Sequence, residues 1–241
     1  MEQVRNKFII IVTQRNAVAY IRKCLDSIVT QSYTNYEVVV VDDYSDDGTF
    51  SIIEEYPFHI IRHTQRKCCA ALNTIEALNL IPVYGDDIIV LVSGDDYLKD
   101  SEVLSHLNTV YQEDILMTYG QFEPISGGYE DFCKPIEDIP AYRHSGVWWA
   151  SHPITFKKKL WDLIDDDDLR AEDGDYGHYS FDAAILYPML EMCGKKYHRF
   201  IDKILYVYND MNPECVYKIL PEENLKESQY FRNKKPYKEL P

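Results

Sequence analysis

Short apolar runs and amphipathic segments alternate along the first 120 residues of the chain. Phe8 to Thr13 is a continuous run of aromatic and β-branched residues, which indicates a strand buried on both faces. The next segment, from Ala17 to Gln31, places Ile21, Leu25 and Ile28 at positions i, i+4 and i+7. This spacing is typical of an amphipathic helix. The chain therefore begins with a strand followed by a helix.

The same alternation repeats twice more before residue 120. The pattern predicts strands over Glu37–Val41, Phe58–Ile61 and Ile88–Val92, and helices over Thr49–Glu55 and Cys69–Leu80. Strands and helices that alternate at short spacing form a parallel sheet covered by helices. We therefore predict an α/β fold with a Rossmann-like, mostly parallel sheet flanked by helices.

The pattern weakens after Gly120. Residues 121–147 are rich in Gly, Pro, Tyr and charge, and predict a long functional loop. Helices are expected over Lys158–Ile164 and Phe181–Cys193, and a strand over Ile204–Tyr208. Between the two helices, the run Asp165–Asp168 is expected to be a solvated loop, because four adjacent acids repel one another in a closed site.

The last twenty or so residues, from Pro221, are charged and contain few aliphatic side chains. They predict a peripheral helix or a partly loose tail. We expect one domain over residues 1–241. Its half over 1–120 would bind a ligand at the strand ends, its half over 121–220 would bind a second substrate, and residues 221–241 would form the peripheral tail.

Composition and charge narrow the classes of protein. A hydrophobic fraction of 46% and a charged fraction of 27% are those of an ordinary globular protein. The formal charge of −15 opposes nucleic-acid binding, so no nucleic-acid partner is expected. The six cysteines lack C-x-x-C spacing and are expected to be reduced. No apolar run suits a signal peptide or a transmembrane segment, so we expect a cytoplasmic protein whose membrane contact, if any, is peripheral.

Two acidic pairs flank the predicted strand Ile88–Val92. Asp86 and Asp87 precede it, and Asp95 and Asp96 follow it. Ligands bind beyond the carboxyl ends of parallel strands, so the second pair is placed to meet a ligand and the first turns the chain. Paired carboxylates suit Mg²⁺ or Mn²⁺, which in turn suits a phosphate-bearing substrate. The alternative is an exposed turn that caps the next helix.

Other polar residues reach the same edge of the predicted sheet. If the sheet is parallel, four strand ends deliver Thr13, Asp43, the loop Arg62–Lys67 and Asp95 to it. The chain contains no G-x-G-x-x-G, G-x-x-x-x-G-K-[ST] or G-x-S-x-G motif. The usual dinucleotide, P-loop and hydrolase interpretations are therefore excluded.

Three segments, FIIIVTQRN, VVVVDDYSDDGT and IIVLVSGDDYL, occur in this order and spacing. Together they resemble the N-terminal half of family 2 glycosyltransferases with the GT-A fold, over about residues 7–120. The resemblance implies an inverting transfer of a sugar from a nucleotide-diphosphate sugar, with a UDP-sugar as the expected donor. It also implies a glycan or other hydroxyl acceptor, and Mn²⁺ or Mg²⁺ as the cofactor on the diphosphate.

The resemblance assigns the nucleotide end of the site. Thr13 and Arg15 fall where family members contact the base, although an aromatic residue commonly stands in place of Arg15. Asp43 matches an acid that accepts a hydrogen bond from the base, and Asp42 is expected to shape the turn before Gly48.

The resemblance also assigns the diphosphate end. Asp95 and Asp96 match the metal motif, with Asp96 on the ion and Asp95 reaching the ribose or sharing the ion through water. Many members carry a further acid where this chain has Ser93, which leaves that division open. Arg62, Arg66 and Lys67, at the end of the third predicted strand, could hold the diphosphate, or could be exposed to solvent.

The catalytic base of an inverting transfer takes the proton of the acceptor hydroxyl. The resemblance places it near the start of a helix such as SFDAAILYPMLEMCG, which makes Asp182 the candidate. An acid in a first helical turn can also be a cap or a helix-dipole partner. Glu172, Asp173 and Asp175 are the alternative bases.

Three further side chains are candidates for the acceptor site. Trp148 and Trp149 could stack on a sugar ring, or could pack in the core. His152 could add a metal ligand or an acceptor contact, or could be structural.

Two rival functions stay open. A sugar nucleotidyltransferase shares the metal and the doubly wound sheet, but usually has a Gly-rich loop after its first strand, where this chain reads TQRNAVAY. A non-catalytic carbohydrate- or nucleotide-binding protein would keep the metal site without turnover.

Overall fold

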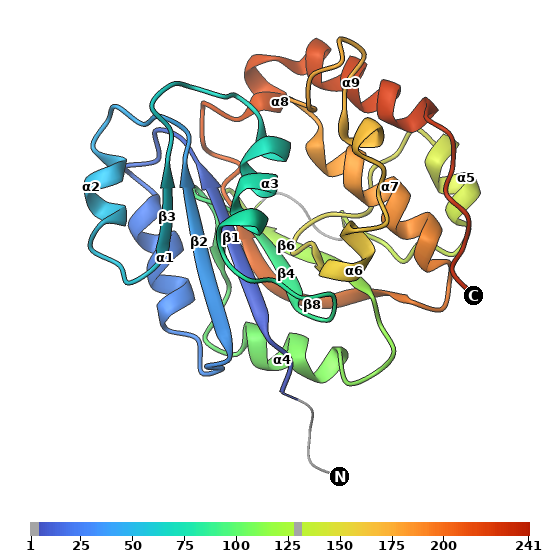
Figure 1. Cartoon of the computed structure of the whole chain (residues 1–241), viewed down its shortest axis with the longest axis horizontal. Coiled ribbons are helices and arrows are strands. Elements are labelled where there is room, and N and C mark those ends of the chain that lie inside the picture. Colours follow the sequence, from blue (N-terminus) through green and yellow to red (C-terminus); the bar gives the residue numbers. More distant parts are fainter. Residues whose placement is uncertain (1–4, 128–131) are drawn as a thin grey trace.

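The computed structural model describes residues 5–127 and 132–241, and within them a mixed α/β fold built on one curved sheet (Figure 1). Residues 128–131 of the predicted loop lie outside the described residues. The strands are β1 (Phe8–Gln14), β2 (Tyr36–Asp42), β3 (His59–Arg62), β4 (Ile88–Ser93), β5 (Tyr97–Leu98), β6 (Met117–Pro124), β7 (Thr155–Lys157) and β8 (His198–Tyr208). The helices are α1 (Ile21–Val29), α2 (Thr49–Ile53), α3 (Ala70–Leu80), α4 (Val103–Val110), α5 (Ile139–His144), α6 (Lys158–Trp161), α7 (Phe181–Cys193), α8 (Val216–Ile219) and α9 (Pro221–Asn233).

The sheet order is β3-β2-β1-β4-β7-β6-β8-β5. β1 pairs in parallel with β2 and β4, and β2 pairs in parallel with β3, which confirms the predicted parallel core. β7 runs antiparallel between β4 and β6, and β5 runs antiparallel to β8. In the register of β1, Thr13 lies beside Ser93 and Gln14 lies beside Asp42. These strand ends therefore meet at one edge, as the sequence predicts.

Both faces of the central strands are buried, because successive side chains of a strand point to opposite faces. Ile9 and Ile11 of β1 pack into a core with α3 and α7. Phe8, Ile10 and Val12 pack into a second core with α1 and α4. Each fully buried side chain of this kind contributes about 1.5–3 kcal/mol. The continuous apolar run of the first strand has this two-sided burial as its physical reason.

The second half contains more regular structure than its sequence indicates. β6 extends to Pro124 and α5 lies within the segment predicted as a loop. A register shift between Gly120 and Phe122 interrupts the pairing of β6 with β8, which hides the strand periodicity. β8 begins at His198, whereas the sequence predicts a strand from Ile204. The prediction misses the first half of the strand because it carries exposed polar residues such as Asp202.

Two predicted segments of the second half are shorter or more ordered than expected. The helix predicted over Lys158–Ile164 ends at Trp161 and continues as a turn. The acidic run Asp165–Asp168 forms a 3-10 turn over Asp166–Leu169, and most of its side chains are exposed, as predicted.

The pair Asp86 and Asp87 turns the chain before β4, where the Asp87 carboxylate accepts the N–H of Tyr84 at 2.9 Å.

The C-terminal segment is held on the second half by the buried guanidinium of Arg143. Arg143 of α5, 2% exposed, donates to the carboxylate of Glu191 on α7. The other end of its guanidinium donates to the carbonyl oxygens of Phe231, Arg232 and Lys234, at 3.0–3.2 Å. α9 therefore lies against α7 (Figure 1). Of the tail over 221–241, Pro221–Asn233 forms the predicted peripheral helix, and residues 234–241 continue without helix or strand.

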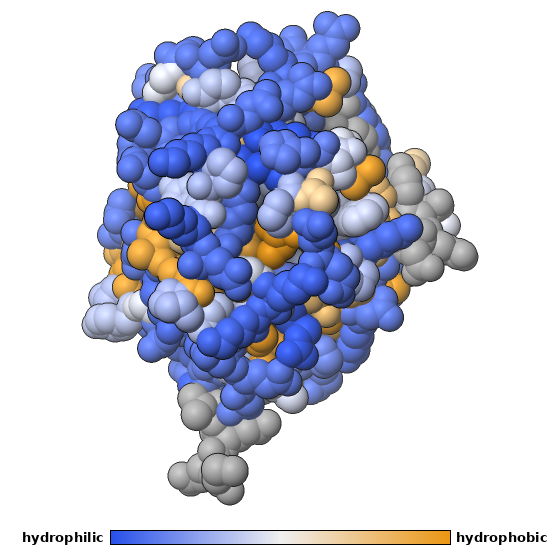
Figure 2. All heavy atoms as spheres, turned by 90° about the vertical axis from the view of Figure 1, so that its right-hand side faces the viewer, coloured by the Kyte–Doolittle hydropathy of each residue, from blue (hydrophilic) through white to orange (hydrophobic). Residues whose placement is uncertain are grey.

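The face that carries the C-terminal half is largely hydrophilic, and its apolar side chains lie in small separate groups (Figure 2). No helix among the described residues is long and apolar enough to span a membrane.

Arg143→Ala should lower the free energy of unfolding by about 3–5 kcal/mol, because it leaves Glu191 buried without its partner. Arg199→Ala is the matched control, since Arg199 and Glu113 form an exposed pair whose loss costs about 0–1 kcal/mol. Urea denaturation measures both values. Equal, small losses in the two variants would contradict the anchoring role of Arg143.

Candidate active site

A cavity of about 810 Å³ opens at the carboxyl ends of β1 and β4. α7, α8 and α9 contribute its other walls. Seven of the residues singled out in the sequence line it: Thr13, Arg15, Asp95, Asp96, Trp148, His152 and Asp182. Residues from the two halves of the chain thus face one space.

Asp95 and Asp96 sit just beyond β4, where the chain turns close to β1. A Cβ on Gly94 would lie 2.3 Å from the Cβ of Gln14, so only glycine fits at this approach. Asp95 is half-buried, and one of its oxygens accepts a hydrogen bond from the Asn212 amide at 2.6 Å. Asp96 is 1% exposed, and accepts from the Tyr206 hydroxyl and the Asn209 N–H, both at 2.7 Å. Asp95 is therefore the more accessible of the two carboxylates.

Burial acts on the charge of both acids. It raises the pKa of Asp95, against the lowering effect of the Asn212 hydrogen bond. Burial and the neighbouring charge of Asp95 raise the pKa of Asp96 well above its usual range. Two adjacent desolvated carboxylates favour protonation unless a cation compensates them. Their oxygen donors thus fit a hard divalent ion.

His152 lies on the same side of the cavity as this pair. Its ring stacks on Tyr206, whose hydroxyl donates to Asp96, with a centroid distance of 4.7 Å. Burial lowers the pKa of His152 to about 4, so the imidazole is neutral at physiological pH. Its Nδ1 is buried and has no hydrogen-bond partner among the described residues. A neutral imidazole with a spare nitrogen can bind a metal ion or an acceptor hydroxyl.

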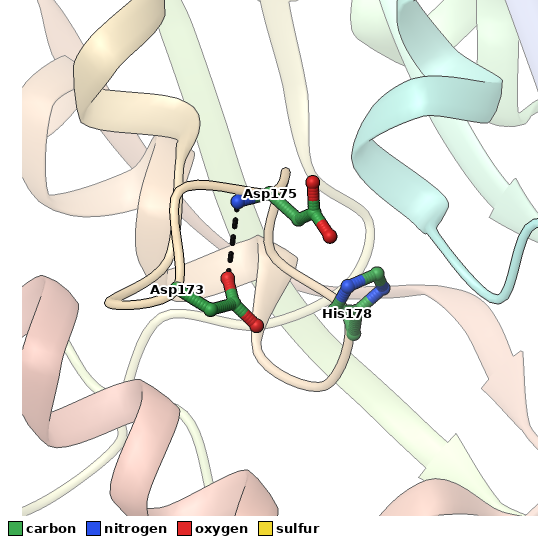
Figure 3. Close-up of side chains that lie close together, drawn as sticks. All are labelled: Asp173, Asp175 and His178. Atoms are coloured by element: carbon green, nitrogen blue, oxygen red, sulfur yellow. Dashed lines mark hydrogen bonds between the residues drawn. The ribbon is translucent and has the colours of Figure 1, made fainter.

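A second group of possible metal ligands lies in the loop before α7. Asp173, Asp175 and His178 point toward one another (Figure 3), and one ligand atom of each lies within 4.8 Å of the others. Both acids are exposed, and Asp173 accepts the N–H of Asp175 at 3.0 Å. The cluster competes with Asp95 and Asp96 as a place for a cation.

Asp43 is placed at the predicted sheet edge, but its carboxylate is taken up by neighbouring groups. It is 5% exposed and accepts the backbone N–H groups of Lys67 and Cys68, at 2.7 and 2.8 Å. His63 lies between Asp43 and Glu76, at 3.0 and 2.6 Å. Burial lowers the pKa of His63, but the hydrogen bonds to both acids outweigh it and the net pKa is raised. Asp43 thus holds the loop that leads into α3.

The remaining predicted residues divide between the cavity and its surroundings. Arg66 is exposed, and Lys67 is half-buried and contacts Asp43 through its backbone. Trp148 lines the cavity and meets Tyr187 edge to face. Trp149 stacks on Tyr142 at 6.0 Å, which is a packing role. The roles predicted for these side chains stay predictions.

Asp182 lies in the first turn of α7, half-buried in the cavity wall. Its carboxylate accepts the N–H of Ala183 at 3.0 Å. Burial is the main cause that raises the pKa of Asp182 to about 6, and the charge of Glu227 raises it further. A carboxylate with this pKa is ionised at neutral pH and is a stronger base than an exposed one.

The sequence reasoning missed several residues that lie at the site or beside it. Asn209 follows the strand predicted over Ile204–Tyr208, so a parallel β8 would have pointed to it. Glu227 and Arg232 lie in the charged C-terminal segment, where nothing separates them from surface residues. Arg232 lines the cavity, and its Nε is buried with no partner among the described residues.

The sequence is similar to those of two glycosyltransferases that are longer than this chain. Glycosyltransferase GlyA of Streptococcus pneumoniae serotype 4 is 34% identical over 129 residues, which are 52% of this chain and 18% of that protein. GlyG of the same organism is 26% identical over 157 residues, which are 58% of this chain and 50% of that protein. The chain thus spans half or less of these relatives.

Solved structures share the fold. The fragment 1-349 of S. aureus TarS, in complex with UDP-GlcNAc, superposes with a TM-score of 0.67 at 19% identity, over 90% of this chain and 63% of that fragment. The mannosyltransferase PcManGT from Pyrobaculum calidifontis, in complex with GDP-Man and Mn²⁺, gives 0.64 at 18% identity, over 97% and 66% of the two chains. The fold is therefore of the GT-A type, as the sequence predicts. The model of the family described as "Glycosyl transferase family 2" matches residues 9–171, and the chain belongs to that family.

Proposed function

We propose that this chain transfers a sugar, with inversion, from a nucleotide-diphosphate sugar to an acceptor hydroxyl. The observation that carries the proposal is that the acidic pair beyond β4 and Asp182 of α7 line one cavity. TarS with UDP-GlcNAc and PcManGT with GDP-Man, two structures of the same fold, support a nucleotide-sugar donor. We take a UDP-sugar as the donor, as the resemblance in the sequence implies.

The two halves of the chain have separate tasks in this proposal. Residues 1–120 hold the donor, with Thr13 and Arg15 at the nucleotide. Asp43 acts on the same end through the loop that it holds, which carries Arg66 and Lys67. Residues 121–220 hold the acceptor, with Trp148 and His152 in the cavity wall. α9, within residues 221–241, completes the wall through Leu225 and Arg232.

A divalent cation belongs at Asp95 and Asp96 in this proposal. Asp95 would hold the ion directly, in place of the Asp96 that the sequence resemblance implies, because Asp95 is the more accessible carboxylate. Asp96, whose oxygens accept from Tyr206 and Asn209, would add negative charge next to it. When bound, Mn²⁺ or Mg²⁺ neutralises charge on the diphosphate as it leaves. The Mn²⁺ in the PcManGT complex supports a divalent cation in a protein of this fold.

Asp182 is the proposed base. As the acceptor oxygen forms its bond to the anomeric carbon, the hydroxyl proton moves to the Asp182 carboxylate. The bond from the anomeric carbon to the diphosphate breaks, and its electron pair leaves with the diphosphate. Attack from the face opposite the leaving group inverts the anomeric centre.

Asp95→Asn should weaken Mn²⁺-dependent binding of a UDP-sugar by at least about tenfold, because the amide lacks the charge that holds the ion. Asp173→Asn is the matched control, since it removes one acid from the other cluster. Titration calorimetry with and without Mn²⁺ measures both. Loss of binding in Asp173→Asn alone would move the metal to that loop. Asp96→Asn tests less cleanly, because it also disturbs the bonds with Tyr206 and Asn209.

Asp182→Asn should lower turnover by about 10²- to 10⁴-fold with little change in donor affinity. In the unchanged enzyme, turnover should fall below pH 6, because protonation of Asp182, with a pKa of about 6, removes the base. A pH series of transfer rates measures this, and proton NMR of the product reports the anomeric configuration. If Asp175→Asn abolishes turnover and Asp182→Asn does not, the base lies elsewhere.

Asp182→Asn should also raise the free energy of unfolding at high pH. The pKa of Asp182 is about 6 in the folded chain against an ordinary value of 3.8, so its ionisation destabilises the folded state by about 3 kcal/mol above pH 6. The free energy of unfolding of Asp182→Asn should therefore exceed that of the unchanged chain by about that amount at pH 8. The gain should shrink as the pH falls through 6 and vanish below 3.8. A gain that does not change with pH in urea denaturation would contradict the raised pKa.

A further inference from the structure

Glu227 of α9 grips the loop that precedes Asp182. Its side chain is buried, at 7% exposed. One oxygen accepts the backbone N–H of His178 at 2.9 Å, and the other accepts those of Tyr179 and Ser180 at 2.7 and 2.6 Å. Three successive N–H groups thus bind one carboxylate, and hydrogen bonds to a charged acceptor are about twice as strong as neutral ones.

This carboxylate lies just before the first turn of α7, where it binds the N–H of the N-cap residue Ser180 and those of the two residues before it. Ser180 is the N-cap residue of α7, but its side chain makes no capping hydrogen bond. The first N–H groups of a helix need partners and favour negative charge nearby. Glu227 supplies negative charge there from another helix, and binds the N–H of Ser180, two residues before Asp182. The start of α7 is therefore fixed from outside.

Other contacts hold the same loop between α9 and the donor half. A Cβ on Gly177 would lie 2.8 Å from the ring of Phe231, so α9 packs closely against the loop. On the other side, the Cys69 thiol donates to the Gly177 carbonyl at 3.3 Å, and His178 Nδ1 donates to the Cys68 carbonyl at 3.1 Å. The loop is thus held by α9 on one side and by Cys68 and Cys69 on the other, and Glu227 makes the charged contacts with it.

We propose that Glu227 is a positioning residue for the transfer reaction: it fixes the backbone of residues 178–180 so that α7 presents the Asp182 carboxylate to the cavity. The proposal rests on the proposed function, because it gives Asp182 a reaction to perform. It also links α9 to the transfer reaction, since Glu227 of this helix binds the loop that leads into α7.

The charge of Glu227 acts on Asp182 as well. Besides burial, the charge of Glu227 raises the pKa of Asp182. The other ionisable groups that face Asp182 are Tyr142 of α5 and Tyr187 of α7, and Arg232 and His178 line the same cavity. Loss of the Glu227 charge should therefore lower the pKa of Asp182.

Glu227→Gln separates these effects from simple damage to the fold. It keeps the size of the side chain, but removes the charge and turns an amide group toward backbone N–H donors. We expect turnover to fall by about tenfold or more, because small displacements of a catalytic group are costly. The acid limb of the pH profile should move to lower pH, and Mn²⁺-dependent donor affinity should not change.

Two readouts do not depend on turnover. Carbon-13 NMR of the aspartate carboxylates, with Asp182 assigned by its absence in Asp182→Asn, should show a lower titration midpoint in Glu227→Gln. Hydrogen exchange of the amides of residues 178–180 should become faster. If the unchanged chain transfers no sugar while both shifts appear, the proposed function fails and the grip of Glu227 on the loop stands.

Glu223→Gln is the matched control, because Glu223 lies one turn earlier on α9 and is exposed. It should leave turnover, the NMR midpoint and exchange unchanged. Glu227→Asp keeps the charge but shortens the reach, so turnover should fall while the midpoint stays near that of the unchanged chain. The proposal is overturned if Glu227→Gln behaves like Glu223→Gln in all three measurements.

Discussion

Parallel pairing of β1 with β2 and β4 is the constraint on which the site depends. It brings the carboxyl ends of these strands to one edge of the sheet, and with them Thr13, Asp43 and Asp95. Burial of both faces of β1 fixes its register, because a shift by one residue would exchange the two cores. The positions of the polar groups beyond the strands follow from the apolar residues within them.

Buried carboxylates are the second theme of the site. Asp43 and Glu227 each bind consecutive backbone N–H groups, and so fix the two loops that meet beside the cavity. Asp96 and Asp182 are instead held at a cost, since burial raises the pKa of each. Groups of this kind are common at catalytic sites, where stability is given up for reactivity.

The sequence predicts the first half of the fold well because its strands are continuous apolar runs and its helices are amphipathic. The acidic pair Asp95 and Asp96 is predictable for the same reason, since it ends such a run. The second half is harder to predict. A register shift masks β6, polar residues mask the start of β8, and α5 is short. Glu227 acts through a tertiary contact with residues 178–180, and no local pattern reveals a contact of that kind.

The most direct test of the account is a crystal structure of the chain with UDP and Mn²⁺, with the ion located by its anomalous scattering. We expect a manganese peak next to Asp95, the diphosphate beside it in the cavity, and the Asp182 carboxylate facing the space left for the sugar. A peak only at Asp173, Asp175 and His178, or a nucleotide bound outside the cavity, would contradict it.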